Sequence, residues 1–116
     1  MHRIHYAGDS ILTGSAIALG LLDYARALAQ AGSADTVSIP TLDENCGAGR
    51  SEVLVGPSSQ LIADEEKSRC EELIDEGLVA DLAGKSDRLR RYGTSTPQDA
   101  LPPIQPGDGW SEFDGI

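Results

Sequence analysis

The stretch RIHYAGDSILT, residues 3–13, contains two short runs that favour β-strands, Arg3–Ala7 and Ser10–Thr13. Two residues, Gly8 and Asp9, separate these runs. Glycine accepts the positive φ angle that the two-residue turns of β-hairpins need. The stretch is therefore predicted to form a tight antiparallel β-hairpin.

The wider stretch HYAGDSILTG, residues 5–14, resembles the nucleophile block of the GDSL/SGNH hydrolases. In that family Gly-Asp-Ser supplies the catalytic serine, so the resemblance implies Ser10 as a nucleophile beside Asp9. It also implies a parallel, flavodoxin-like or SGNH-like fold. In such a fold Arg3–Ala7, the following helix and Thr36–Pro40 would form a right-handed βαβ unit.

A serine hydrolase also needs a histidine that takes the proton from the serine. GDSL/SGNH hydrolases place that histidine near the C-terminus, in an Asp-x-x-His motif. The two histidines of this chain, His2 and His5, both precede Ser10, and the family's Gly-x-Asn-Asp block is missing. We therefore expect a turn here rather than an active site. A reduced GDSL-like hydrolase that uses Ser10 and Asp9 is the alternative.

The residues after this hairpin predict a helix and then a second hairpin. Ser15 is placed to cap a helix over residues 16–31, with Gly32 at its C-terminal end. Asp35–Leu42 and residues 51–56 are predicted as two strands joined by a glycine-containing loop. Apolar residues at helical spacing form one broad stripe on the helix: Ile17, Leu21, Tyr24, Ala25 and Leu28.

A second helix is predicted over residues 65–84, with Asp64 as its cap and Cys70 on its apolar stripe. Two alternatives stay open for its end, since it can break at Gly77 or continue through residues 85–92. Two hairpins, each followed by a helix, give a small α+β two-layer domain with a mainly antiparallel sheet. The parallel βαβ arrangement is the alternative.

The charge of the chain limits its partners. The formal net charge is −10 at pH 7. Such a surface repels phosphate, so neither nucleic acids nor membranes are expected to bind. Basic proteins or cations are the partners that this field would attract.

The cysteines and histidines predict no metal or cofactor site. Cys46 and Cys70 lack the spacing of a metal or redox motif. They are expected to be two reduced thiols in a cytoplasmic protein, and a single disulfide between them is the alternative. His2 and His5 are three residues apart on a predicted strand, which points them to opposite faces.

The composition changes at Gly93, so we expect a single domain over residues 1–92 and an extended acidic tail over residues 93–116. The tail contains four of the six prolines and no Lys or Arg.

The only Trp and the only Phe of the chain lie in this tail, as Trp110 and Phe113, and Ile116 follows at the same spacing. Large aromatic side chains are strong anchors in interfaces. We therefore expect a non-enzymatic interaction module that docks a protein partner, or a second copy of itself, through these three residues. Two alternatives stay open, a tail that folds back on its own domain and a tail that is disordered.

Overall fold

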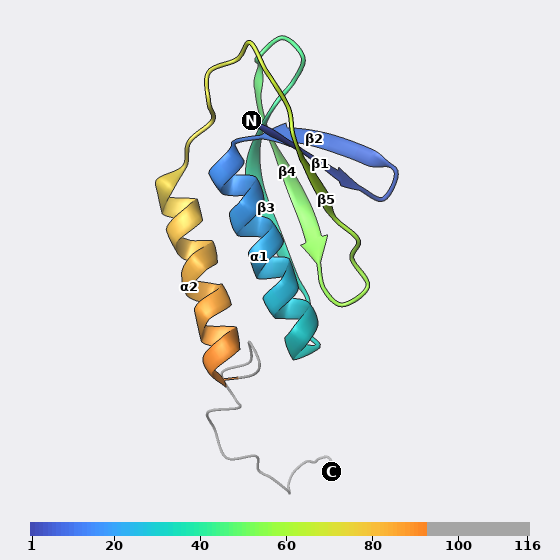
Figure 1. The fold of residues 1–116 in the computed structure, drawn as a ribbon, viewed down its shortest axis with the longest axis vertical. Helices are drawn as coiled ribbons and strands as arrows, with labels where there is room; N and C mark the ends of the chain where they lie inside the picture. The colour runs from blue at the N-terminus through green and yellow to red at the C-terminus, as the bar shows by residue number, and fades with distance from the viewer. Residues whose placement is uncertain (93–116) are drawn as a thin grey trace, which may run out of the picture.

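The structure, a computed structural model, describes residues 1–92 and shows a small α+β domain. Five strands form one antiparallel sheet in the order β4-β3-β2-β1-β5. Helix α1 lies against the sheet, and α2 packs beside α1 (Figure 1). The predicted tail, residues 93–116, lies outside the described residues. The elements are β1 (His2–Tyr6), β2 (Asp9–Thr13), α1 (Ser15–Ala31), β3 (Asp35–Leu42), β4 (Ala48–Val55), β5 (Ile62–Glu65) and α2 (Glu76–Tyr92).

The predicted first hairpin is confirmed, but its turn lies one residue earlier than expected. Ala7 and Gly8 form the turn, with φ angles of 53° and 82°, and Tyr6 pairs with Asp9. Two successive positive φ angles define the type I′ turn, which favours glycine at its second position. Strand β1 pairs with β2 and β5 and not with β3. The parallel βαβ alternative is therefore wrong.

Ala7 is strained in this turn, because L-residues other than Asn and Asp rarely adopt a left-handed conformation. We expect Ala7→Asn to raise the free energy of unfolding by about 0.5–1 kcal/mol, since Asn-Gly is the preferred type I′ pair. Urea denaturation followed by circular dichroism measures the change. The control is Ala80→Asn on the exposed side of α2, which should lower stability slightly. Equal effects at the two sites would contradict the prediction.

Helix α1 has the predicted stripe and the predicted end, but a different start. Gly32 has a left-handed φ of 69° and closes the helix with backbone bonds. Gly14, not Ser15, is the N-cap residue, and it has no side chain to offer the first turn. The start of α1 therefore needs a hydrogen-bond acceptor from elsewhere. The core joins the stripe of α1 to both hairpins and α2, through Ile4, Ile17, Ala18, Leu21, Tyr24, Ala27, Leu28, Val37, Ile39, Val53, Val55, Leu82 and Leu89.

Strands β3 and β4 form the predicted second hairpin and pair along their whole lengths. The Pro40 carbonyl of β3 accepts a hydrogen bond from the Thr13 hydroxyl at 2.7 Å, so it points toward β2 and away from β4. Within residues 1–92, the β2–β3 ladder contains one register pair, Leu12 and Leu42. The two hairpins therefore diverge beyond this pair.

The prediction for the second helix is wrong in its first half. Residues 62–65 pair with β1 as strand β5, and residues 66–75 contain no helix or strand. Helix α2 begins at Glu76, where the Asp75 carboxylate accepts the Leu78 N–H at 3.1 Å. Asp75 is thus the effective cap, and Asp64 is a strand residue. The helix runs through Gly77 to Tyr92, as one of the two alternatives expected.

Candidate functional site

Ser10, the candidate nucleophile, is a strand residue opposite His5. Its hydroxyl accepts a hydrogen bond from the Arg3 guanidinium at 3.2 Å. The Nε2 atom of His5 faces the Asp64 carboxylate at 3.3 Å instead, and within residues 1–92 no hydrogen bond joins His5 to Ser10. A guanidinium only donates and cannot take the serine proton. Within residues 1–92, the Ser10 hydroxyl therefore forms no hydrogen bond to a group that could accept its proton.

Arg3 is held beside Ser10 by Glu66. Its Nε and Nη2 atoms donate to the two Glu66 carboxylate oxygens at 2.7 and 2.9 Å. The hydrogen bond from Arg3 lowers the pKa of Glu66 below its usual value. Asp9, the second candidate catalytic residue, accepts the backbone N–H of Ser10 at 2.8 Å. Asp9 therefore organises the backbone next to the turn and does not orient a histidine.

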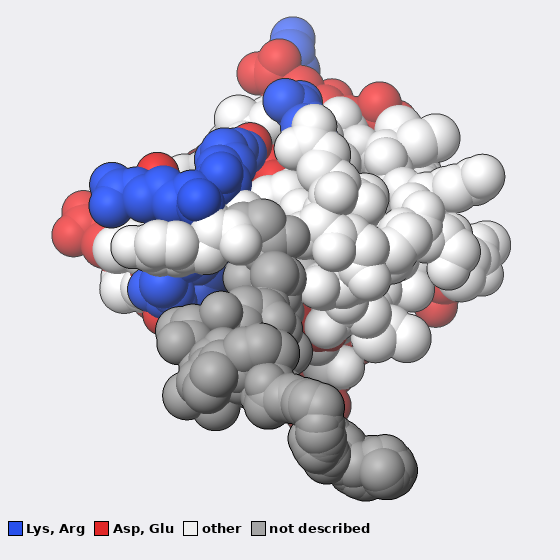
Figure 2. Space-filling view, turned by 90° about the horizontal axis from the view of Figure 1, so that it is seen from below, with Lys and Arg blue, Asp and Glu red and all other residues white. Residues whose placement is uncertain are grey.

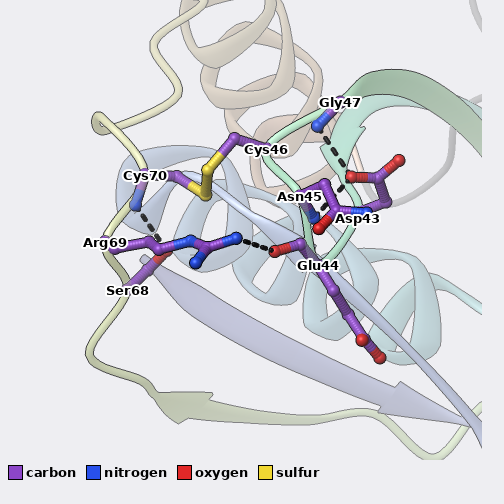
Figure 3. Close-up of a disulfide and its surroundings, with 8 residues drawn as sticks. All are labelled: Asp43, Glu44, Asn45, Cys46, Gly47, Ser68, Arg69 and Cys70. Atoms are coloured by element: carbon purple, nitrogen blue, oxygen red, sulfur yellow. Dashed lines mark hydrogen bonds between the residues drawn. A yellow bond between two sulfur atoms is a disulfide. The ribbon is translucent and has the colours of Figure 1, made fainter.

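The expectation of two reduced thiols is wrong, because Cys46 and Cys70 form a disulfide (Figure 3). The β3–β4 turn and the segment after β5 bring their Cα atoms to 5.6 Å, within the usual range for a disulfide. Arg69 donates to the Glu44 carbonyl at 3.2 Å beside the bond. Asp43 supports the turn by accepting the N–H groups of residues 45 and 47. The disulfide therefore fastens residues 66–75 to the end of the β3–β4 hairpin.

The fastened segment supplies the acceptor that α1 lacks. Glu72 Oε2 accepts the Ser15 N–H at 2.6 Å, and Glu72 Oε1 lies 3.0 Å from the Met1 amino group. The hydrogen bond from Ser15 lowers the pKa of Glu72 below its usual value, and the Met1 amino group adds to the effect. A carboxylate at this position also interacts favourably with the positive, N-terminal end of the helix dipole. Glu72 is thus a remote cap of α1.

We expect Glu72→Ala to lower the free energy of unfolding by about 1 kcal/mol, the usual cost of a lost helix cap. A folded-state pKa below the unfolded value means that the carboxylate stabilises the fold above the unfolded pKa. This stabilisation is lost as the pH falls through the folded pKa. The difference between the parent protein and Glu72→Gln should therefore shrink below about pH 4. Urea denaturation at several pH values measures it.

The control for this prediction is Glu71→Ala. Glu71 is the exposed neighbour of Glu72, and it forms no side-chain hydrogen bond or ion pair within residues 1–92. Equal losses for Glu71→Ala and Glu72→Ala would show that Glu72 is not a cap.

A groove lies between the two hairpins, beside the outer edge of β4. Its hollow has a volume of about 190 Å³. Asp9 and Glu52 are the charged residues among its walls, and no lysine or arginine is among them. In the described chain β4 is an edge strand, so no strand pairs with its outer side. The remaining lining residues are Ile4, Tyr6, Ser10, Ile11, Ser51 and Val53.

A second hollow, of about 490 Å³, continues along the same side between the β1–β2 turn and the loop after β4. Its walls include Tyr6, Gly8, Leu54 and residues 56–60, and none of its lining residues is charged. Figure 2 shows this end of the molecule: basic side chains gather on the side of α2, and most of the remaining described surface is uncharged. Within residues 1–92, the hollow therefore offers no charged side chain as an acid or base, and its Ser59 hydroxyl is hydrogen-bonded to the Gly56 N–H and the Leu54 carbonyl.

The remaining candidate residues are the two histidines and the aromatic residues of the tail. His2 Nδ1 lies 2.8 Å from the Ser15 hydroxyl, so the two histidines have separate partners. Within residues 1–92, no group of three or more His, Cys, Asp or Glu side chains could hold a metal ion. In the same part of the chain, no helix has the length and apolar character that crossing a membrane requires. Trp110, Phe113 and Ile116 lie outside the described residues.

Comparisons with known proteins add no family: no protein-family model, no curated protein and no solved structure matches the chain.

Proposed function

We propose that the protein is a non-enzymatic protein-interaction module, in which Trp110, Phe113 and Ile116 dock a protein partner or a second copy of the chain. The placement of the only Trp and the only Phe supports this proposal. The domain core within residues 1–92 consists of Ile, Leu, Val and Ala side chains with one Tyr. The hydrogen bond from Arg3 to Ser10 weighs against the hydrolase alternative.

Trp110 fluorescence and variants of the full chain test this proposal. The emission of the sole Trp should be red-shifted in the isolated protein, as for an exposed indole, and shift to the blue on binding. The double variant Trp110→Ala/Phe113→Ala should lose the partner in a pull-down, or lose self-association in light scattering. Blue-shifted emission from a proven monomer at high dilution would contradict docking, because it would show that the tail folds back.

The hydrolase alternative has its own test. Hydrolysis of p-nitrophenyl acetate should be equal for the parent protein and Ser10→Ala, since within residues 1–92 the Ser10 hydroxyl has no hydrogen-bonded base. Turnover that depends on Ser10 would overturn the proposal.

The cytoplasmic location stays a prediction, and the Cys46–Cys70 bond removes the reduced thiols on which it rested.

A further inference from the structure

We propose that the groove beside β4 is a second docking site, which binds an extended segment of a basic partner protein through the β4 edge. A Lys or Arg side chain of that segment would lie between Asp9 and Glu52. This site consists of residues within 1–92 and goes beyond the proposed function.

The direction of the β4 backbone is the first observation. The Leu54 carbonyl accepts hydrogen bonds from the Tyr6 hydroxyl at 2.6 Å and from the Ser59 hydroxyl at 3.2 Å, so it points away from β3. Backbone groups two residues apart on a strand point the same way. The N–H and C=O groups of Glu52 and Arg50 therefore point to the outer edge as well. Such an edge is what an added peptide strand pairs with.

The pairing of β3 with β4 supports this direction independently. Arg50 lies opposite Pro40, which has no N–H to give to a ladder. The Pro40 carbonyl bonds to Thr13, on the far side of β3 from β4. The backbone groups of Arg50 are therefore not engaged with Pro40. With the Leu54 carbonyl occupied, Arg50 and Glu52 offer the pairing positions along β4.

The walls of the groove define the side chain that fits it. Ile4, Tyr6, Ile11 and Val53 supply apolar contact, and Asp9 and Glu52 supply negative charge. Neither carboxylate forms an ion pair with another side chain within residues 1–92. A long aliphatic stem with a cationic head matches this combination, since Lys and Arg bury their stems and keep their heads at polar groups.

Charge also decides between the candidate occupants. The whole chain has a net charge of −10, which attracts basic partners over long distances. Residues 93–116 contain acids and no Lys or Arg, so neither the chain's own tail nor that of a second copy supplies the cation. A second copy as a whole has the same net charge of −10 and is repelled, so we assign the site to a segment of a different, basic protein.

A phage-displayed library of random heptapeptides, selected on the full-length oxidised protein, tests the site. Enriched peptides should contain Lys or Arg among β-branched residues, as an extended strand with a cationic side chain requires. A fluorescently labelled copy of one enriched peptide then gives the affinity by anisotropy. Replacing its basic residue with Glu should weaken binding by about tenfold or more, the effect of losing one charge-assisted contact.

Variants of the protein locate the bound peptide. Asp9→Asn/Glu52→Gln should weaken binding about tenfold, while Asp9→Asn keeps the oxygen that accepts the Ser10 N–H. The control Glu65→Gln removes an exposed acid of β5, the other edge strand, and should leave affinity unchanged. Binding should also slow amide hydrogen exchange at Arg50 and Glu52.

The site would be overturned by no enrichment, by enrichment of acidic or wholly apolar peptides, by an affinity indifferent to Asp9→Asn/Glu52→Gln, or by unchanged exchange at the β4 edge. Trp110→Ala/Phe113→Ala should bind the peptide as the parent protein does. The two docking sites can therefore fail separately. Loss of peptide binding in that double variant would assign the peptide to the tail and overturn the groove.

Discussion

Replacement of both cysteines, Cys46→Ser/Cys70→Ser, is expected to lower the free energy of unfolding by about 3.5 kcal/mol, because the disulfide closes a loop with a sequence separation of 24. Removing the bond returns the entropy of that loop to the unfolded chain. In the folded state it also frees residues 66–75, which have no helix or strand of their own to hold them. Urea denaturation followed by circular dichroism measures the loss.

Reduction of the parent protein with dithiothreitol should cause a similar loss, because Cys46 is exposed and the reagent can reach the bond. The Ser/Ser variant is the matched control, since dithiothreitol should not change its stability. A loss below about 1 kcal/mol in both experiments would mean that the disulfide does not constrain this loop as the loop-entropy relation requires.

Loss of the disulfide should increase local opening most at the start of α1 and in the segment that caps it. Without the disulfide, Glu72 keeps its place through Ser15 and the Met1 amino group, and Glu66 through Arg3. The two ion pairs among these contacts, Met1–Glu72 and Arg3–Glu66, are partly exposed, and such pairs contribute little each. Hydrogen exchange should therefore increase first in residues 66–75 and in the first turn of α1, before the hairpins open.

The parts of the fold that could be predicted are those set by local signals. The two-residue spacing in residues 3–13 predicted the first hairpin, and the 3.6-residue period with Gly32 predicted α1. The predicted position of the turn was wrong by only one residue. These features are determined by residues that are close in sequence, so the local pattern of residue types is enough to predict them.

Residues 64–75 could not be predicted in this way, because distant partners determine their conformation. Asp64 pairs with β1, Glu66 binds Arg3, Cys70 bonds to Cys46 and Glu72 caps α1. Their acidic and apolar spacing suits a helix equally well, and nothing local rejects it. A long-range contact overrode the local preference at each of these positions.

The candidate sites, too, could be predicted only as far as local sequence signals define them. The missing downstream histidine already argued against a nucleophilic Ser10, but only the sheet register showed that Arg3 occupies its hydroxyl. The groove could not be predicted without the strand order, because Asp9 and Glu52 are far apart in sequence and line one hollow only in the folded sheet. The one available signal was Pro40, whose missing N–H limits how its strand can pair.

Gly14→Ala is the second change with a large expected effect. A Cβ atom at residue 14 would lie 1.8 Å from the Leu73 carbonyl oxygen and 2.9 Å from the Leu73 carbonyl carbon. These are backbone atoms, so the segment that contains Leu73 must move away. That movement breaks the contact of Glu72 with Ser15. We expect a loss of about 3 kcal/mol in the free energy of unfolding, an overpacking penalty together with a lost helix cap.

The matched control is Gly20→Ala, which lies in the same helix. A Cβ atom there would meet Leu82 Cδ1 at 3.6 Å, an ordinary contact, so this variant should gain up to about 1 kcal/mol from helix propensity. The backbone angles of Gly14, φ −66° and ψ 151°, suit alanine, so a loss at residue 14 reports crowding and not backbone strain. A neutral Gly14→Ala would show that residues 66–75 do not pack against the start of α1.

Combining Gly14→Ala with Cys46→Ser/Cys70→Ser tests whether both changes act through the position of residues 66–75. Once the disulfide no longer holds the segment, the alanine should cost less than it does alone, because the segment can move aside.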